Sequence, residues 1–218
     1  MRRKIPFVAA SLLALAVASV TCGGGKKNSG DATGGRTVYI AGESNNRAIL
    51  WKNSAAQQLS GTEYRGYAAS VFVSGSDVYA AGGEYTGELL YPSTVSPVQW
   101  KNGARQELSA TGNYSWVNSV FVSGGDVYVA GRDGIQWVGE GEGYYRRAML
   151  WKNGTQQQLS STALYTFANS VYVVGSDVYV TGDEYHTNDP EVPKAVFWKN
   201  GVRQQLSSNA EAFSVFVK

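Results

Sequence analysis

The chain has 218 residues, of which 43% are hydrophobic and 17% charged, and its formal net charge is +2 at pH 7. This composition is typical of a folded globular protein and excludes a chain that is disordered throughout. A net charge this close to zero argues against nucleic acid as the main partner.

Residues 1–21 are expected to be an export signal that is removed. Three basic residues at positions 2–4 precede an uncharged, mostly apolar stretch over 5–20, which is short for a span of the bilayer. The only cysteine of the chain, Cys22, follows directly. A lone cysteine cannot form an internal disulfide, so we expect it to carry a lipid after cleavage. An ordinary secretion signal followed by a free thiol is the alternative.

The segment 22–36 is expected to be a lipid-bearing cysteine and a flexible tether, because "GGGKKNSGDATGGR" is rich in Gly and small polar residues. Removal of the three basic residues of the signal would change the net charge from +2 to −1. The sequence "SVTC" resembles the bacterial lipoprotein signal, although Thr21 departs from the usual Gly or Ala. The resemblance implies an extracytoplasmic protein that is lipid-anchored to a bacterial membrane, at the outer membrane or the cell surface.

Residues 37–218 contain one motif four times, as "AILWKNSAAQQLS", "PVQWKNGARQELS", "AMLWKNGTQQQLS" and "AVFWKNGVRQQLS". Three copies are preceded by a second motif, which reads "SVFVSGSDVYAAG", "SVFVSGGDVYVAG" and "SVYVVGSDVYVTG". Each full copy therefore holds four short apolar runs, which we take as four strands. No helical period follows residue 36.

Two of the three connections inside each copy are predicted to be tight hairpins. Asn-Gly stands between the third and fourth strands at 102–103, 153–154 and 200–201, and Asn-Gly is a strong hairpin signal because both turn residues need positive φ. The first copy has the weaker Asn53-Ser54 at this point. In contrast, the second and third strands are separated by loops whose lengths differ strongly between the copies.

Four antiparallel strands that recur with a long period are typical of a β-propeller blade. The fold class we expect is an all-β, four-bladed propeller over 37–218, in which the strand 214–218 completes the first blade and closes the ring. A fragment of a longer ring is the alternative. The chain resembles exported bacterial β-propeller lipoproteins with "WKNG" repeats, a resemblance that covers 37–218 and implies little about activity.

Antiparallel order places all fixed hairpins at one end of the blades and all variable loops at the other, which predicts the ligand-binding end. Aromatic rings beside carboxylates suit sugars or peptides. The residues we select as ligand-binding are Glu84, Tyr85, Trp116, Asp133, Trp137, Tyr144, Tyr145, Glu184 and Tyr185. The alternative for each ring is packing between blades.

The repeated tryptophans Trp51, Trp100, Trp151 and Trp198 are expected to fill equivalent slots between blades. Asp77, Asp126 and Asp177 are expected to cap turns. No cofactor or metal is expected. With a single histidine, His186, and a single cysteine, the chain lacks the residues of a His-based triad or a zinc cluster.

We therefore predict a monomeric binding module that recognises a glycan, a peptide or an envelope protein. Two alternatives stay open: a glycan hydrolase that uses rim carboxylates such as Glu84, Asp133, Asp183 and Glu184, and a structural component of an envelope assembly. A calcium site formed by Asp183, Glu184, Asp189 and Glu191 is a further possibility, although the spacing matches no standard loop.

Overall fold

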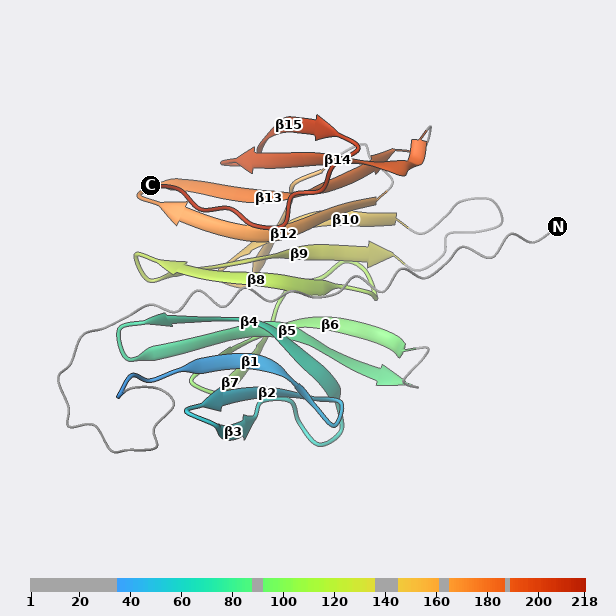
Figure 1. Cartoon of the computed structure of the whole chain (residues 1–218). Helices are drawn as coiled ribbons and strands as arrows, with labels where there is room; N and C mark the ends of the chain where they lie inside the picture. Colours follow the sequence, from blue (N-terminus) through green and yellow to red (C-terminus); the bar gives the residue numbers. More distant parts are fainter. Residues whose placement is uncertain (1–34, 88–91, 136–144, 161–164, 187–188) are drawn as a thin grey trace.

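The computed structural model describes residues 35–87, 92–135, 145–160, 165–186 and 189–218, and this part of the chain is all-β, as the sequence predicts (Figure 1). Its strands, in chain order, are β1 (Tyr39–Ser44), β2 (Arg47–Lys52), β3 (Ala55–Gln58), β4 (Arg65–Ser74), β5 (Asp77–Gly87), β6 (Pro92–Lys101), β7 (Ala104–Glu107), β8 (Trp116–Ser123), β9 (Asp126–Ile135), β10 (Tyr145–Lys152), β11 (Thr155–Gln158), β12 (Tyr165–Val174), β13 (Asp177–His186), β14 (Asp189–Lys199) and β15 (Val202–Ser208).

The strands form four antiparallel units that follow the sequence repeat. Unit 1 is β1–β3, unit 2 is β4–β7, unit 3 is β8–β11 and unit 4 is β12–β15. Units 3 and 4 share one eight-stranded sheet, because β10 and β12 meet through a single parallel pair, Arg146 with Tyr165. The outer strands β3, β7 and β15 are exposed along their whole length, as their Gln- and Arg-rich sequences predict.

The predicted tight hairpins are present and explain much of the repeated motif. Asn102 and Gly103 have φ of 51° and 83°, and the equivalent turns of units 3 and 4 have the same left-handed geometry. In unit 1 Ser54 adopts φ of 71°, a conformation that favours glycine. Register is therefore fixed by the turn chemistry at this end of each unit, which we call the hairpin end. The opposite end is called the loop end.

The hydrophobic core lies in the layers between successive units. Trp100, Trp151 and Trp198 are at most 1% exposed, which confirms the packing role predicted for the tryptophan of units 2, 3 and 4. Trp51 of unit 1 is only partly buried. Each layer combines side chains of two units, such as Trp198 and Val180 of unit 4 with Leu150 and Ala130 of unit 3. A unit cannot bury both of its faces alone, so the stack depends on contact between neighbours.

The innermost strand of units 2, 3 and 4 carries a β-bulge near the loop end, after Ala68, Val117 and Ala168. A glycine lies opposite each bulge, and a Cβ on Gly182 would stand 1.7 Å from the carbonyl oxygen of Phe167. Only glycine permits this approach of the two backbones. The bulge re-aims the residues that precede it, Tyr67, Trp116 and Phe167, at the loop end.

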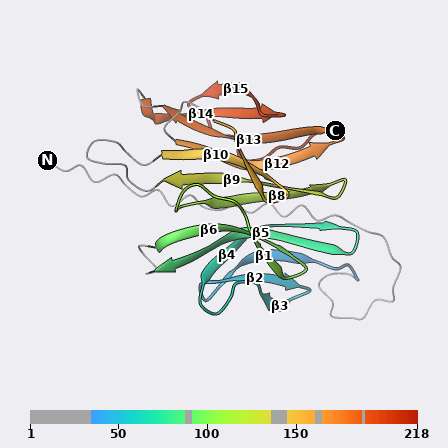
Figure 2. The same ribbon diagram turned by 180° about the vertical axis from the view of Figure 1, so that it is seen from behind.

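The part of the chain that the structure describes does not form the closed four-bladed ring predicted from the sequence. β1 pairs only with β2 among the described residues, so unit 1 has three strands. Residues 214–218 form no strand and lie beside β12, where the Val215 amide donates to Ser170 Oγ (3.4 Å). Units 1 and 4 lie at opposite ends of the stack, with units 2 and 3 between them (Figures 1 and 2), so the segment on unit 4 does not reach β1.

Candidate functional site

The hairpin ends of units 2, 3 and 4 carry the same network of hydrogen bonds and ion pairs. Asn102 Oδ1 accepts from the Val78 amide (2.9 Å), and its Nδ2 donates to Asp77 Oδ1 (2.8 Å). Lys101 bonds the same carboxylate at 2.8 Å and stacks on the Tyr79 ring. Lys101 and Asn102 together hold the pKa of Asp77 below its usual value. Units 3 and 4 repeat this network around Asp126 and Asp177, which therefore lock two hairpins together.

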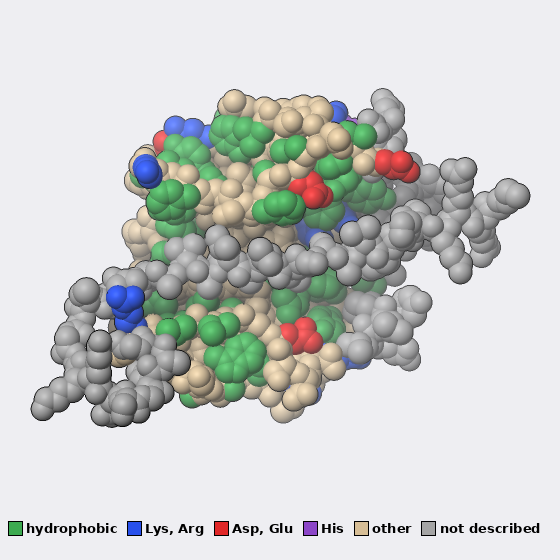
Figure 3. All heavy atoms as spheres, viewed as in Figure 1, with side chains coloured by type: hydrophobic (Ala, Val, Ile, Leu, Met, Phe, Trp, Pro, Cys, Tyr) green, Lys and Arg blue, Asp and Glu red, His purple; other side chains and the backbone are tan. Residues whose placement is uncertain are grey.

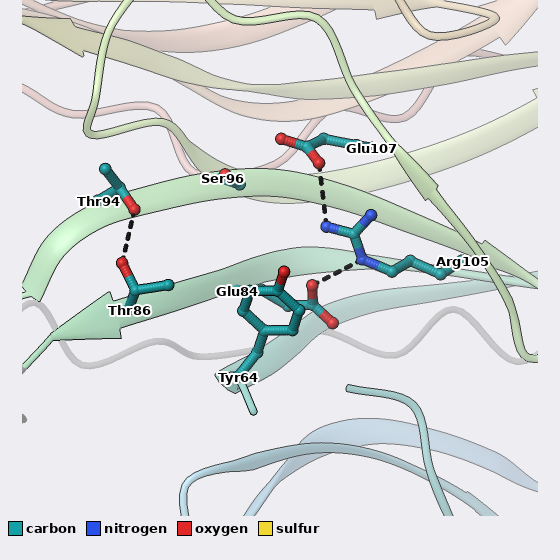
Figure 4. A pocket seen from close by; sticks show the side chains of 7 residues that line it. All are labelled: Tyr64, Glu84, Thr86, Thr94, Ser96, Arg105 and Glu107. Atoms are coloured by element: carbon teal, nitrogen blue, oxygen red, sulfur yellow. Dashed lines mark hydrogen bonds and ion pairs between the residues drawn. The ribbon is translucent and has the colours of Figure 1, made fainter. Parts of the chain in front are cut away.

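A polar pocket of about 230 Å³ opens on the side of unit 2 that faces unit 1, towards the loop end (Figure 4). Its walls come from β5, β6, β7 and the connection between β3 and β4. The lining residues are Tyr64, Glu84, Thr86, Thr94, Ser96, Arg105 and Glu107. Glu84 is the one residue of this set that the sequence selected.

Glu84 and Arg105 form the centre of the pocket. Arg105 Nε donates to Glu84 Oε2 at 2.7 Å, and Nη2 contacts Glu107 Oε2 at 3.1 Å. The guanidinium also lies over the Tyr64 ring, 5.6 Å from its centroid. Glu84 is only 2% exposed, and its second oxygen, Oε1, is buried without a hydrogen-bond partner in the described structure. A buried acceptor left unpaired is costly, so a donor brought by a ligand would stabilise Glu84 if the side chain turned this oxygen towards the pocket.

Hydroxyl groups complete the pocket. Thr86 Oγ1 and Thr94 Oγ1 lie 2.9 Å apart on paired strands, and the Ser96 side chain lies on the same wall. A hydroxyl can donate and accept, so each of these groups can exchange its present bond for one to a ligand. Figure 4 shows the threonine pair and the Glu84–Arg105 pair on opposite sides of the open space.

Unit 4 repeats the ion pair. Arg203 Nε donates to Glu184 Oε2 at 2.7 Å, and His186 Nε2 lies 3.7 Å from the same oxygen. Glu184 is 3% exposed, so this pair is also buried on its acidic side. Units 2 and 4 therefore share the same buried ion pair, and the pocket of about 230 Å³ lies around the pair of unit 2.

Asp133, the equivalent residue of unit 3, is held by the connection between units 2 and 3. Its carboxylate accepts from the amides of Thr111 and Gly112 at 3.0 Å and from Ser115 Oγ at 2.6 Å. Thr111 Oγ1 adds a further bond. In the described part of the chain Glu84, Asp133 and Glu184 thus bond to three different sets of partners and not to one another.

The selected aromatic residues lie at the loop end but are spread over different units. Trp116 stacks on Tyr67 with ring centroids 5.3 Å apart and on the Arg132 guanidinium at the same distance. Tyr185 donates to Glu211 Oε1 (2.8 Å) and packs edge-on against Phe167. Tyr85 is half-buried, and burial raises the pKa of its hydroxyl. These rings do not meet the pocket lining.

The remaining selected aromatics give no side-chain geometry. Trp137 and Tyr144 lie outside the described residues. Tyr145 begins β10 opposite Ile135, and its side chain is not described. Of the calcium ligands considered from the sequence, the side chain of Asp189 is not described. The described residues contain no cluster of three or more His, Cys, Asp or Glu side chains that could hold a metal ion.

Two arginines at the junction of units 3 and 4 were not selected from the sequence. Arg132 lies between the rings of Trp116 and Phe167, at 5.3 and 5.1 Å, and Arg146 lies over Tyr165 and Phe167. Burial, and then the charge of Arg146, lower the pKa of Arg132 to about 10. These guanidinium groups fill the layer between units by stacking, a role that the apolar pattern of the strands does not reveal.

Arg105 was also missed, although the repeat contains a signal for it. The position five residues after the repeated Trp is Arg in unit 2, which has Glu84, and in unit 4, which has Glu184. The same position is Ala56 in unit 1 and Gln156 in unit 3, which have no Glu equivalent to Glu84. Glu and Arg thus occur together or not at all. Comparing the four copies position by position would have predicted both ion pairs.

No protein-family model matches this chain, and no curated protein matches its sequence. The site therefore has to be interpreted from its own geometry. In the described residues, no helix is long and apolar enough to cross a membrane.

Proposed function

We propose that the chain is a binding module built of β-propeller blades, and that it recognises a neutral glycan through the pocket around Glu84. The observation that carries the proposal is the buried and unpaired Oε1 of Glu84 at the wall of a polar pocket of about 230 Å³. A sugar hydroxyl is a small donor that could pair with this oxygen once the Glu84 side chain turns towards the pocket, and hydrogen bonds to carboxylates are among the stronger ones.

The other walls suit the same class of ligand. Tyr64 offers a ring on which the apolar face of a sugar can stack, and Thr86 and Thr94 offer hydroxyls that can donate or accept. Two carboxylates, Glu84 and Glu107, surround one guanidinium, so the charges disfavour an anionic ligand. Of the ligands expected from the sequence, a neutral glycan fits this lining better than an acidic peptide.

The location of the module is part of the proposal and rests on the sequence. Export directed by 1–21, a lipid on Cys22 and the tether 23–36 would hold the strand units on a bacterial membrane surface, outside the cytoplasm. A module in that position meets cell-surface glycans, which agrees with the chemistry of the pocket.

The test is a glycan array probed with the purified chain and with the variants Glu84→Gln and Glu184→Gln. Loss of one charged hydrogen bond should weaken binding roughly 10- to 100-fold in Glu84→Gln. Glu184→Gln is the matched control, because it disrupts the same type of ion pair in unit 4 without altering the pocket.

Equal loss in both variants would show that the effect is structural, and an array without any hit would contradict the glycan proposal. Mass spectrometry of bound glycans distinguishes recognition from cleavage. Cleaved product would favour the hydrolase alternative.

A further inference from the structure

The innermost strands of the units form a ladder that continues into residues 214–218. Phe72 and Phe121 have ring centroids 4.7 Å apart, Phe121 and Tyr172 again 4.7 Å, and Tyr172 and Phe216 5.1 Å. All four rings occupy the same place in the motif "SVFV" or "SVYV". The ladder shows that 214–218 is seated on unit 4 as the first strand of a further unit would be.

Backbone contacts between neighbouring inner strands repeat in the same way. Ser70 Oγ accepts from the Val120 amide at 3.1 Å and Ser119 Oγ from the Val171 amide at 3.3 Å. Ser170 Oγ accepts from the Val215 amide at 3.4 Å. The segment 214–218 is thus positioned by the contacts that position a true inner strand, yet it pairs with no second strand in the described structure.

The missing partner leaves apolar surface open. Phe216 is 68% exposed, and the neighbouring Phe213 is 69% exposed. Figure 3 shows hydrophobic side chains on the face seen in this view, both over the upper units and over the lower units. Exposed apolar side chains beside an unpaired strand edge are typical of an interaction surface.

Unit 1 has the reciprocal defect. Within the described ranges, β1 has no strand on its inner side, where β5, β9 and β13 have β4, β8 and β12. Ile40 is 50% exposed, whereas the residues at its position in the other units, Ala80, Val129 and Val180, are at most 1% exposed. The edge of β1 therefore lacks the strand that 214–218 resembles.

We propose that a second copy of the chain supplies this strand, so that segment 214–218 of each copy pairs antiparallel with β1 of the other. Strand β1 and the segment 214–218 lie at opposite ends of the stack, which favours a partner over closure within the chain (Figures 1 and 2). Two copies related by a twofold axis make the contact twice and close a ring of eight units. This replaces the monomer expected from the sequence and is independent of the glycan pocket.

The register of the new pair follows from the other units. Val71 lies opposite Ala80 and Phe72 opposite Tyr79, and units 3 and 4 use the same pairing. Val215 therefore lies opposite Ile40, and Phe216 opposite Tyr39, of the other copy. This pairing covers Ile40 and Phe216, and it removes the open edge of β1 and the open edge of the segment 214–218.

Engineered disulfides test the pair and its origin. Cys22→Ser first removes the only native thiol of the full chain. Two double variants are made in this background and oxidised: Ile40→Cys/Val215→Cys and Tyr39→Cys/Phe216→Cys. Neighbouring antiparallel pairs alternate between close and wide spacing, so one of the two variants has the close geometry. We expect a covalent dimer on a non-reducing gel. A covalently closed monomer, or no crosslink in either variant, would overturn the proposal.

Light scattering of the unmodified chain provides a second, independent measurement. We expect the mass of two copies, and the mass of one copy for Ile40→Lys, because a charge there would be buried in the pair. Val202→Lys is the control, since Val202 is 72% exposed on the outer strand of unit 4. A monomeric unmodified chain, or an unchanged dimer in Ile40→Lys, would contradict the proposal.

Discussion

Trp100, Trp151 and Trp198 occupy equivalent positions but differ in the hydrogen bonding of the indole Nε1. Trp151 Nε1 donates to the Ser109 carbonyl at 2.6 Å. The Nε1 atoms of Trp100 and Trp198 are buried without a hydrogen-bond partner in the described structure. Replacement of Trp by Phe removes the same side-chain volume at each position. All three side chains are at most 1% exposed, so each replacement leaves a buried cavity. The cavity cost should therefore be similar at each position, and differences should come from the hydrogen bonds.

The expected difference can be worked out from these contacts. Trp151→Phe loses one net hydrogen bond, about 1 kcal/mol, whereas Trp198→Phe removes a buried unpaired donor that costs about 1–3 kcal/mol in the native chain. Ser109 is exposed, so water can replace the lost donor and Trp151→Phe carries no further cost. For the unpaired donor of Trp198 we take the lower end of the range, about 1 kcal/mol. Trp151→Phe should then be less stable than Trp198→Phe or Trp100→Phe by about 2 kcal/mol.

Urea denaturation followed by circular dichroism measures this difference. A chain of four units can unfold in more than one step, so midpoints and slopes are compared together. Equal loss in the three variants, or a larger loss in Trp198→Phe, would refute the assignment of the indole hydrogen bond.

Three further predictions concern Asp183, Gly182 and Cys22. Burial raises the pKa of Asp183 to about 6, while bonds from the Ala212 amide and Asn169 act in the opposite direction. Because this value lies above that of the unfolded chain, the free energy of unfolding should fall as the pH rises from about 4 to 6, by an amount on the order of 2–3 kcal/mol. Asp183→Asn should lose this dependence, and identical pH profiles for both proteins would contradict it. Gly182→Ala should prevent folding or lower Tm sharply, because its Cβ would collide with backbone. The control is Gly175→Ala, which should lower Tm much less, because the space around its Cβ is open and only its positive φ is unfavourable. Thermal melts of the two variants measure this difference, and similar melting would count against the bulge geometry. Cys22→Ala should release the protein from membranes, and unchanged membrane fractionation would disprove the lipid anchor.

The parts of the fold that the sequence predicts are those fixed by local chemistry. Asn-Gly turns need positive φ and set the register of each hairpin, and the structure has this geometry at 102–103, 153–154 and 200–201. The repeated Trp is buried in units 2, 3 and 4 because an equivalent residue meets an equivalent slot in each of them. Both inferences need only a few neighbouring residues.

Ring closure could not be predicted from the repeat, because it depends on how each unit is rotated against the next. Small differences between layers add up along the stack, and no single motif determines their sum. The match between 214–218 and the other inner strands was visible in the sequence, but the sequence did not distinguish a partner strand in the same chain from one in a second copy.

The candidate site was predicted only in part for a related reason. The β-bulges next to Ser70, Ser119 and Ser170 alter which side chains face which layer, and strict alternation along the strands does not reveal this shift. Glu84 was selected as a rim residue, but its partner Arg105 was read as part of a solvated edge. Its pairing depends on the close approach of β5 and β7 across β6.

The most direct test of the account is hydrogen exchange of the chain with and without a glycan that binds on the array. The account predicts slower exchange in peptides that cover the pocket, around Tyr64, Glu84 and Thr94, and no change at the hairpins 74–77 and 101–104. Protection at the hairpin end, or unchanged exchange around the pocket at a saturating glycan concentration, would contradict the division of each unit into a structural end and a binding end.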